Sequence, residues 1–439
     1  MTPDPRSTGS QLAGAPLPRA VWLLSWVSFF ADVSSEMVYP LLPLFLVGVL
    51  HSTKTQLGAI EGAAVLLVAV MTAFAGWRSD RLGKRVPWIR FGYGLPILGK
   101  AIIALATAWP MVLGGRLLDR FGKGLRASPR DALIGDVVGI DQRGRAFGIH
   151  RAFDTAGALL GVLLSAFLLW WLTGTPQQSA GAAAEHAAQT PAWVYRAIFG
   201  VGAALGVASL LLTLLLKESG ATKSPSSIPS AAALDSVEAT MPRAAGLGLP
   251  RSYWSVLSVL ILFSLANSSD TFLLLRASDF GFSPWAVVLL YALFNLTYAV
   301  VSYPAGVLSD AIGRWRVIAV GWALYAMVYV GLAVLPSETS WGMWPLMAFY
   351  GVYMGLTDGV GKALIVDHVP ATSRGTAMGL FYAATGFTTL LASLIVGLAW
   401  DRAGAPTAFG IGAAFAIVAL LTLPMMRGRL SRWGAPVGR

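Results

Sequence analysis

The chain has no cysteine and few charged residues. Its 439 residues include no Cys, and only 12% are Asp, Glu, Lys or Arg, about half of the roughly 25% that is usual in globular proteins. The missing cysteines exclude disulfides, thiolate metal sites and cysteine nucleophiles. The shortage of charge excludes a water-soluble fold, because 56% of the residues are hydrophobic and cannot all be hidden from water. The sequence therefore predicts a protein that lies in a lipid bilayer.

Motifs of enzymes and of ATP-driven pumps are also missing. The sequence has no Gly-x-x-x-x-Gly-Lys-Ser/Thr phosphate loop, no His-Glu-x-x-His zinc site and no Gly-x-Ser-x-Gly elbow. We therefore expect no enzyme activity, no catalytic residues, no metal centre and no bound cofactor.

Long apolar runs dominate what is present. Twelve of them are about long enough to cross a bilayer as a helix. Because the runs are continuous and not alternating, they predict an all-α membrane protein and not a barrel of strands. They lie at 20–49, 56–77, 88–108, 110–137, 145–172, 193–216, 252–275, 284–307, 316–335, 342–366, 375–400 and 405–426. The fourth run is the least apolar.

Basic residues outnumber acidic ones by 32 to 21, which gives a net charge of +11. In a soluble protein this excess would suggest nucleic acid. Here most of the cations lie in the tails and in the loops after even-numbered runs, and positive loops stay in the cytoplasm. We therefore expect both termini inside a cell inner membrane and no nucleic-acid partner.

A polar segment at 217–250, rich in Ser, Pro and Ala, separates six runs from the other six. Its composition is typical of a flexible linker. The predicted organisation is a cytoplasmic tail at 1–19, a six-helix bundle at 20–216, a second bundle at 251–426 and a tail at 427–439. The first tail lacks the apolar core of a signal peptide.

The two halves repeat each other. The segment 76–84, Gly-Trp-Arg-Ser-Asp-Arg-Leu-Gly-Lys, recurs at 306–314 as Gly-Val-Leu-Ser-Asp-Ala-Ile-Gly-Arg, and 31–36 is echoed by 266–270. Matches in the same order indicate a parallel duplication, and hence two pseudo-symmetric bundles. Carriers built from such repeats bind their substrate near the middle of the membrane, between the halves.

Charges at membrane depth are costly and usually functional. The cations predicted there are Lys100, Arg116, Arg120, Lys123, Arg126, Arg130 and Lys362. The acids predicted there are Asp32, Glu36, Asp119, Asp131, Asp154, Asp270 and Asp358. Because the two sets balance, we expect these charges to be paired and the net excess to lie in the loops and tails.

The charges of the fourth run share one face of a helix, a stripe about 140° wide. Such a stripe should face a water-filled cavity or acidic neighbours. Arg116 and Arg120 are expected in the cavity. For Arg126, Arg130 and Asp131 the alternative is a structural network at the cytoplasmic rim.

Two carboxylates of the first run, Asp32 and Glu36, are one helical turn apart. Two neighbouring carboxylates repel, so one of them is suited to bind and release a proton. The alternative is permanent pairing with the cations of the fourth run. Pro40 and Pro43 follow these two carboxylates and are expected to kink the helix.

Other polar groups inside the runs are further candidates. His150 and Asp154 could relay protons or form an ion cluster at the cytoplasmic end. Asp270 is a third proton-coupling candidate. The remaining candidates for the cavity are Asn267, Asn295, Asp358 and Lys362.

The loop after the second run resembles the loop motif of the major facilitator superfamily, and the likeness extends over the whole chain. The residues that carry it are Gly76, Asp80, Arg81, Gly83, Lys84 and Arg85, with a weaker copy at Asp310, Gly313 and Arg314. The resemblance implies two six-helix bundles of the MFS fold and a loop that latches one of two alternating-access states. The alternative is a basic loop that only sets topology.

Further stretches, 32–43 and 116–154, look like a bacterial exporter-type branch of this superfamily. Either Arg116 or Arg120 is similar to its arginine on the fourth helix. The Gly-Pro pair of the drug antiporters is replaced by Gly157-Ala158, which weakens an assignment to drug antiport.

The sequence therefore predicts a secondary transporter that moves a small polar or charged molecule by alternating access, as a monomer in the lipid bilayer. Proton-coupled efflux, an antiport driven by an ion gradient, is the preferred mode. The alternatives are a divalent metal exporter, an organic-anion or metabolite transporter and, more remotely, a membrane sensor on a transporter scaffold.

Overall fold

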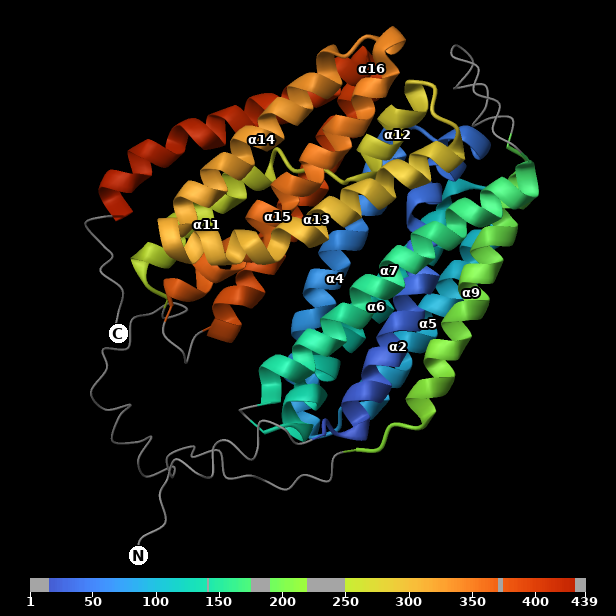
Figure 1. Cartoon of the computed structure of the whole chain (residues 1–439), viewed down its shortest axis with the longest axis vertical. Helices are drawn as coiled ribbons and strands as arrows, with labels where there is room; N and C mark the ends of the chain where they lie inside the picture. The colour runs from blue at the N-terminus through green and yellow to red at the C-terminus, as the bar shows by residue number, and fades with distance from the viewer. Residues whose placement is uncertain (1–15, 140–141, 175–189, 219–248, 370–373, 431–439) are drawn as a thin grey trace, which may run out of the picture.

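The computed structural model describes residues 16–139, 142–174, 190–218, 249–369 and 374–430, and these residues contain helices and no strand. Most of the two predicted tails and of the linker at 217–250 lies outside them. The helices form two bundles that are joined near one end and diverge toward the other (Figure 1). The predicted all-α membrane fold is confirmed.

The first bundle contains the helices before the linker. They are α2 (Arg19–Glu36), α4 (Lys54–Leu82), α5 (Val86–Ala104), α6 (Trp109–Val137), α7 (Arg143–Thr173) and α9 (Ala192–Leu214). After α2 the chain continues through a 3-10 turn, Tyr39–Leu41, and a π turn, Phe45–Val49. These irregular turns surround Pro40 and Pro43, where the sequence predicts a kink.

The second bundle follows the same order of spans, but its first span is divided into two helices. Its helices are α11 (Arg251–Ser264), α12 (Thr271–Asp279), α13 (Pro284–Ile312), α14 (Arg314–Val334), α15 (Met343–Asp367) and α16 (Arg374–Leu430). α16 consists of two helices that meet at Gly404, whose φ is +82°. α11 and α12 together correspond to the seventh predicted span, so that span is broken and not continuous.

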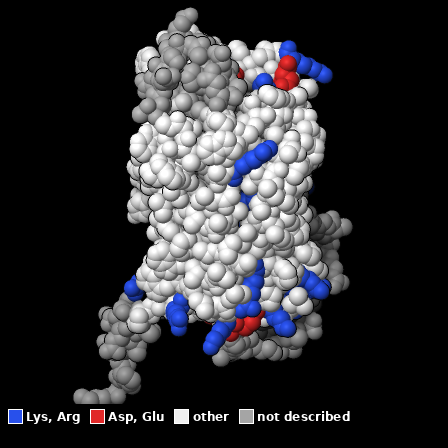
Figure 2. Space-filling model, turned by 90° about the vertical axis from the view of Figure 1, so that its right-hand side faces the viewer, with Lys and Arg blue, Asp and Glu red and all other residues white. Residues whose placement is uncertain are grey.

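Apolar side chains form the belt that a membrane requires. Seven helical segments of the described chain are long and apolar enough to cross a bilayer on their own. α6 is not one of them, in agreement with its low predicted hydrophobicity. In the face shown in Figure 2, Lys and Arg gather at the two ends of the molecule, most of them at the lower end, and the middle is almost uncharged.

The bundles touch most closely where α4 meets α16. A Cβ atom on Gly58 would lie 2.2 Å from the Ser393 carbonyl oxygen, and one on Gly397 would lie 2.5 Å from the Lys54 carbonyl oxygen. Only glycine allows backbones to approach this closely in a membrane.

The carboxylate of Asp401 joins the two bundles at the same end of the molecule. Asp401 accepts hydrogen bonds from the backbone N–H groups of Lys54 and Thr55, at 2.9 and 2.8 Å, and from the Thr55 hydroxyl at 2.6 Å. It therefore caps the positive N-terminus of α4 from the other bundle. The two halves are closed at this end.

Candidate functional site

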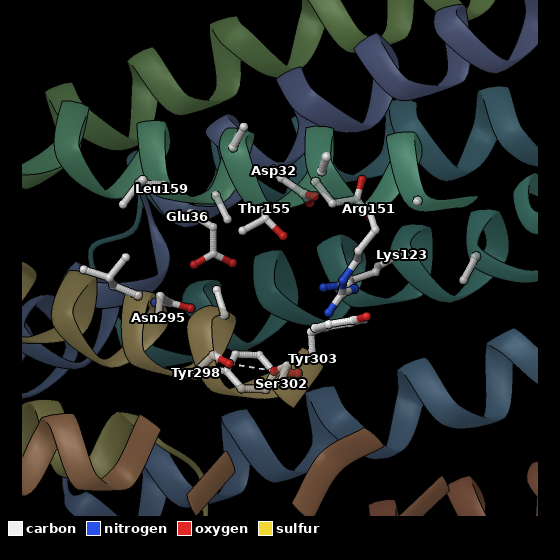
Figure 3. Close-up of a pocket in the computed structure, with 18 of the residues that line it drawn as sticks. Asp32, Glu36, Lys123, Arg151, Thr155, Leu159, Asn295, Tyr298, Ser302 and Tyr303 are labelled. Atoms are coloured by element: carbon white, nitrogen blue, oxygen red, sulfur yellow. Dashed lines mark hydrogen bonds between the residues drawn. The ribbon is translucent and has the colours of Figure 1, made fainter. Parts of the chain in front are cut away.

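Two adjoining cavities lie between the bundles. Their volumes are about 900 and 910 Å³, and both are lined by Glu36, Lys123 and Ala127. One lies between α7 and α13, the other between α4 and α16. The first extends to Gly148 and Tyr303, near the ends of α7 and α13 that lie away from the closed seam. Figure 3 shows Arg151, Lys123 and Tyr303 at one side of this cavity, with Glu36 and Asn295 at the other.

Most of the predicted site residues line these cavities. Those in the first are Asp32, Glu36, Arg126, Arg130, Asp154 and Asn295. Those in the second are Glu36, Arg120, Asp131, Asn267 and Asp270. The structure thus brings together candidates from α2, α6, α7, α13 and the break between α11 and α12.

Arg116 is expected in the cavity but lies elsewhere. It is buried and donates two hydrogen bonds to Glu61 on α4, both at 2.8 Å. This bidentate pair gives the buried guanidinium the counter-charge that it requires. Arg120 is the better placed of the two arginines for contact with a bound molecule, because it lines the second cavity.

A network of charges continues from this pair along α6. Asp119 lies 3.4 Å from Lys100 and 3.7 Å from both Arg116 and Arg120. Asp119 and Lys100 are buried. The part of the stripe nearest the closed end therefore faces acidic neighbours and forms a structural network, of which Glu61 and Arg120 also line the second cavity.

The next part of the stripe does face the cavity. Arg126 donates to the Gly92 carbonyl at 3.0 Å and lies over the Tyr93 ring. Arg130 pairs with Asp131 at 2.9 Å and donates to the Ser28 hydroxyl. These arginines therefore line the first cavity and are also anchored to neighbouring helices, and their role in binding stays a prediction.

Asp32 and Lys123 differ from the other charges of the site. Within the described chain neither forms a hydrogen bond or an ion pair, although both line the first cavity. Glu36, one turn along α2, accepts a hydrogen bond from the Tyr291 hydroxyl of the other bundle at 2.9 Å. The permanent pairing considered for these two carboxylates is thus not present in this conformation.

Asp270 is the corresponding carboxylate of the second bundle. It accepts a hydrogen bond from the Tyr350 hydroxyl at 2.7 Å. Tyr350 belongs to a group of packed tyrosine rings, with Tyr353 at 5.3 Å and Tyr325 at 6.1 Å between centroids. Asn267 lies nearby in the same cavity wall, and its side-chain oxygen is buried without a partner.

Two other predicted pairs are formed by the structure. His150 Nδ1 lies 3.4 Å from Asp154, and the pair is mostly buried. Lys362 donates to Asp358 at 2.8 Å, and the Tyr298 hydroxyl donates to the same carboxylate at 3.0 Å. Asp358 and Lys362 line neither of the two cavities, so they lie beside the site and not in it.

The two loop motifs lie at the end where the bundles diverge. Gly83 and Gly313 have φ values of +61° and +96°, which glycine adopts easily. Arg85 pairs with Asp136 at 2.6 Å, and Arg314 pairs with Asp367 and, at 3.5 Å, with Asp310. In this conformation each motif is bound to the end of a helix in its own bundle.

The remaining residues of the first loop motif form fewer contacts in the described structure. Gly76 packs against Ser128 of α6, and Arg81 lies over the Trp77 ring. The Asp80 side chain is outside the described part of the structure, so its predicted role as a hydrogen-bond acceptor stays a prediction.

Glu61 is the functional-site neighbour that the sequence analysis misses. It is the only acidic residue of the second apolar run, 56–77, and an acid at membrane depth indicates a cation on another helix. With Glu61 included, the acids at membrane depth outnumber the cations considered above by one. The expected balance is therefore wrong, which fits with carboxylates that have no cation beside them.

Comparison with known sequences identifies relatives over the whole chain. The family described as Major Facilitator Superfamily matches residues 24–360 and 256–432. An uncharacterized MFS-type transporter of Methanocaldococcus jannaschii is 32% identical over 93% of this chain and 94% of its own. The multidrug resistance protein MdtH of Photorhabdus laumondii is 32% identical over a shorter segment, 30% of this chain and 33% of its own.

Solved structures of similar fold are transporters. The nucleoside transporter NupG has a TM-score of 0.72 at 14% identity, covering 93% of this chain and 100% of its own. A D-xylose-proton symporter has a TM-score of 0.71 at 14% identity, covering 92% and 96%. A bacterial homologue of Spinster in an inward-facing, occupied conformation has a TM-score of 0.70 at 15% identity, covering 99% and 100%.

Proposed function

Because the chain belongs to the Major Facilitator Superfamily, a family of membrane transporters and not of enzymes, we propose that it exports a small polar or charged molecule in exchange for protons. The cavity between the bundles takes the substrate from one side of the membrane. Rocking of the two bundles about the α4–α16 seam then exposes the cavity to the other side.

The observation that carries the proton coupling is the state of Asp32. It lines the first cavity, lies one turn from Glu36, and has no hydrogen-bonding or ionic partner in the described chain. A carboxylate in such surroundings is balanced either by a proton or by a cation that enters the cavity. Lys123, which lines the same cavity without an ion pair, can approach Asp32 when the proton leaves.

Export is supported by the relative MdtH, whose name describes multidrug resistance. Only part of the chain carries that similarity, so it supports the direction of transport and not the substrate. The gathering of Lys and Arg at one end of the molecule (Figure 2) supports an orientation with that end in the cytoplasm of the inner membrane.

An organic anion is the second candidate substrate. Lys123, Arg126 and Arg151 line the first cavity, and none of them forms an ion pair with a carboxylate of the described chain. Guanidinium groups bind carboxylates and phosphates in a bidentate manner. Divalent metal export has less support, because the described residues contain no group of three His, Cys, Asp or Glu side chains that could hold such an ion.

The proposal is tested in two steps with the full chain. A thermal-shift screen of the purified protein against cationic drugs, organic anions and divalent metals selects a transport probe. Uptake of that probe into inverted vesicles is then driven by a proton gradient. We expect Asp32→Asn to abolish gradient-driven accumulation and to preserve exchange of labelled for unlabelled probe, since exchange needs no net proton movement.

The matched control is Asp358→Asn, which changes a carboxylate of the other bundle that lies outside both cavities. It should leave accumulation close to that of the unmodified protein. Unchanged accumulation by the Asp32 variant would reject Asp32 as the proton carrier, whereas loss of both accumulation and exchange would assign it to binding of the probe.

A further inference from the structure

The seventh span is interrupted near its middle. α11 ends at Ser264 and α12 begins at Thr271, and the residues between them are not helical. The matching segment of the first span, 31–36, lies inside α2. Non-helical backbone at membrane depth occurs where protein surrounds it or where it lines a cavity, and 267–270 lines the second cavity.

The interruption leaves several oxygen atoms without donors. In the described structure no hydrogen bond reaches the main-chain carbonyl oxygens of Leu265, Asn267 or Ser268. The side-chain oxygen of Asn267 is also buried and unpartnered. Unpaired carbonyl groups at membrane depth are costly, so this concentration of free acceptors in one short segment needs an explanation.

The same place contains a carboxylate without a cation beside it. Asp270 has the Tyr350 hydroxyl as a partner and no Lys or Arg at ion-pair distance within the described residues. The C-terminus of α11 places the negative end of a helix dipole on one side of the break, and the N-terminus of α12 places a positive end beside Asp270 on the other. One carboxylate, one amide oxygen and main-chain carbonyls form a set of oxygen ligands with a single negative charge.

We propose that the break between α11 and α12 binds one Na⁺ ion, with Asp270 and Asn267 as its side-chain ligands. Unwound backbone carbonyls and the C-terminal ends of half-helices are suited to monovalent cations. A divalent ion would require more carboxylates around it. The site is separate from Asp32, so the first bundle exchanges protons and the second bundle binds a metal cation.

The surroundings hold this segment in place and connect it to the seam between the bundles. The Ser269 amide donates to the Ser393 hydroxyl at 3.1 Å, and the Tyr325 hydroxyl donates to the Ala266 carbonyl. Ser393 is the residue whose carbonyl packs against Gly58. Occupation of the site therefore stabilises the backbone that carries the close contact of α16 with α4, and with it the conformation that is closed at that end.

Binding is measured on the purified full chain, without substrate and without a proton gradient. Thermal unfolding is followed in NaCl, KCl and methylammonium chloride, with choline chloride keeping the ionic strength constant, and equilibrium binding of ²²Na⁺ gives the stoichiometry. We expect NaCl to raise the Tm in a saturable manner and one Na⁺ to bind per chain. Asp270→Asn should weaken Na⁺ binding at least tenfold, and Asn267→Ala should weaken it by a smaller factor.

The control is Asp358→Asn, whose binding should equal that of the unmodified chain. If Asp270→Asn does not fold, Asn267→Ala and the ²²Na⁺ stoichiometry still decide the question. Equal effects of NaCl and choline chloride, or a Tm that responds to methylammonium but not to Na⁺, would overturn the proposal. Neither result bears on Asp32, because the transport test of that residue is done at constant Na⁺.

Discussion

The two bundles share a fold and differ in how they treat buried polar groups. The first pairs charges with charges, as in the contact of Arg116 with Glu61 at 2.8 Å. The second surrounds its carboxylate with hydroxyl groups and aromatic rings, including Tyr325 and Tyr329 with centroids 4.1 Å apart. An ion network resists change because each group loses its counter-charge on separation, whereas the carboxylate of Asp270 has a hydroxyl partner and no counter-charge to lose among the described residues.

The first prediction tests the ionic half of this comparison and has the largest expected effect. Glu61→Gln removes the counter-charge of Arg116 and leaves a buried guanidinium. We expect the free energy of unfolding to fall by about 3–5 kcal/mol, measured by denaturation in mixed micelles. The double variant Glu61→Gln/Arg116→Met should recover part of the loss, and a loss under 1 kcal/mol would show that the network does not hold the first bundle together.

The second prediction concerns the hydroxyl network. Tyr325→Phe removes one of the two donors to the Ala266 carbonyl at the break of the seventh span, which keeps the Ser268 amide at 3.1 Å. The loss of one hydrogen bond costs about 0.5–1.5 kcal/mol, so the free energy of unfolding should fall by that amount, and Na⁺ binding should weaken as well. Tyr93→Phe in the first bundle, which removes a hydroxyl 3.2 Å from Ser28, serves as the comparison and should leave Na⁺ binding intact.

The third prediction addresses the contact that joins the halves. Asp401→Asn weakens the cap on α4, which costs about 1 kcal/mol. This corresponds to a roughly fivefold larger population of the conformation that is open at this end. Because the native chain has no cysteine, a thiol introduced by Ser52→Cys, buried at this end, reports opening by its labelling rate. The rate should rise about fivefold with Asp401→Asn and stay constant with Asp367→Asn at the opposite end.

The smallest effect is expected at the ion pair of the second bundle. Asp358 and Lys362 are each more than a third exposed, and such pairs contribute about 0–1 kcal/mol. Asp358→Ala should therefore change stability by less than 1 kcal/mol in the denaturation assay used for Glu61. A loss as large as that of Glu61→Gln would remove the proposed contrast between the bundles.

The sequence was sufficient for the architecture because membrane spans have a simple physical signature. Apolar runs of bilayer length predict the helices, and the repeat of 76–84 at 306–314 predicts the two halves. Pairs of polar residues that are close in the sequence could be predicted as well. His150 with Asp154, and Asp358 with Lys362, are four residues apart, and helical spacing alone brings them together.

The remainder of the site depends on packing between helices that are distant in sequence. Nothing in the neighbourhood of Glu61 indicates Arg116, fifty-five residues later, as its partner. The break of the seventh span had a weak local signal, since Asn, Ser and Asp hydrogen-bond to the backbone and favour helix ends. The segment 267–270 contains only these residue types, but which carbonyls remain free depends on Ser393 and Tyr325, which belong to other helices.

The glycine contact of α4 with α16 also determines how far the opposite end of the molecule moves when the two bundles rotate. Gly58 lies near the start of α4 and Leu82 at its end, a length of about 36 Å at the rise of an α-helix. A rotation of about 10° around this contact would move the far end by about 6 Å. A methyl group added at Gly58 or Gly397 would push the two helices apart at the point about which the bundles rotate. The width of the opening at the opposite end would then change severalfold more than the distance between the helices at this contact.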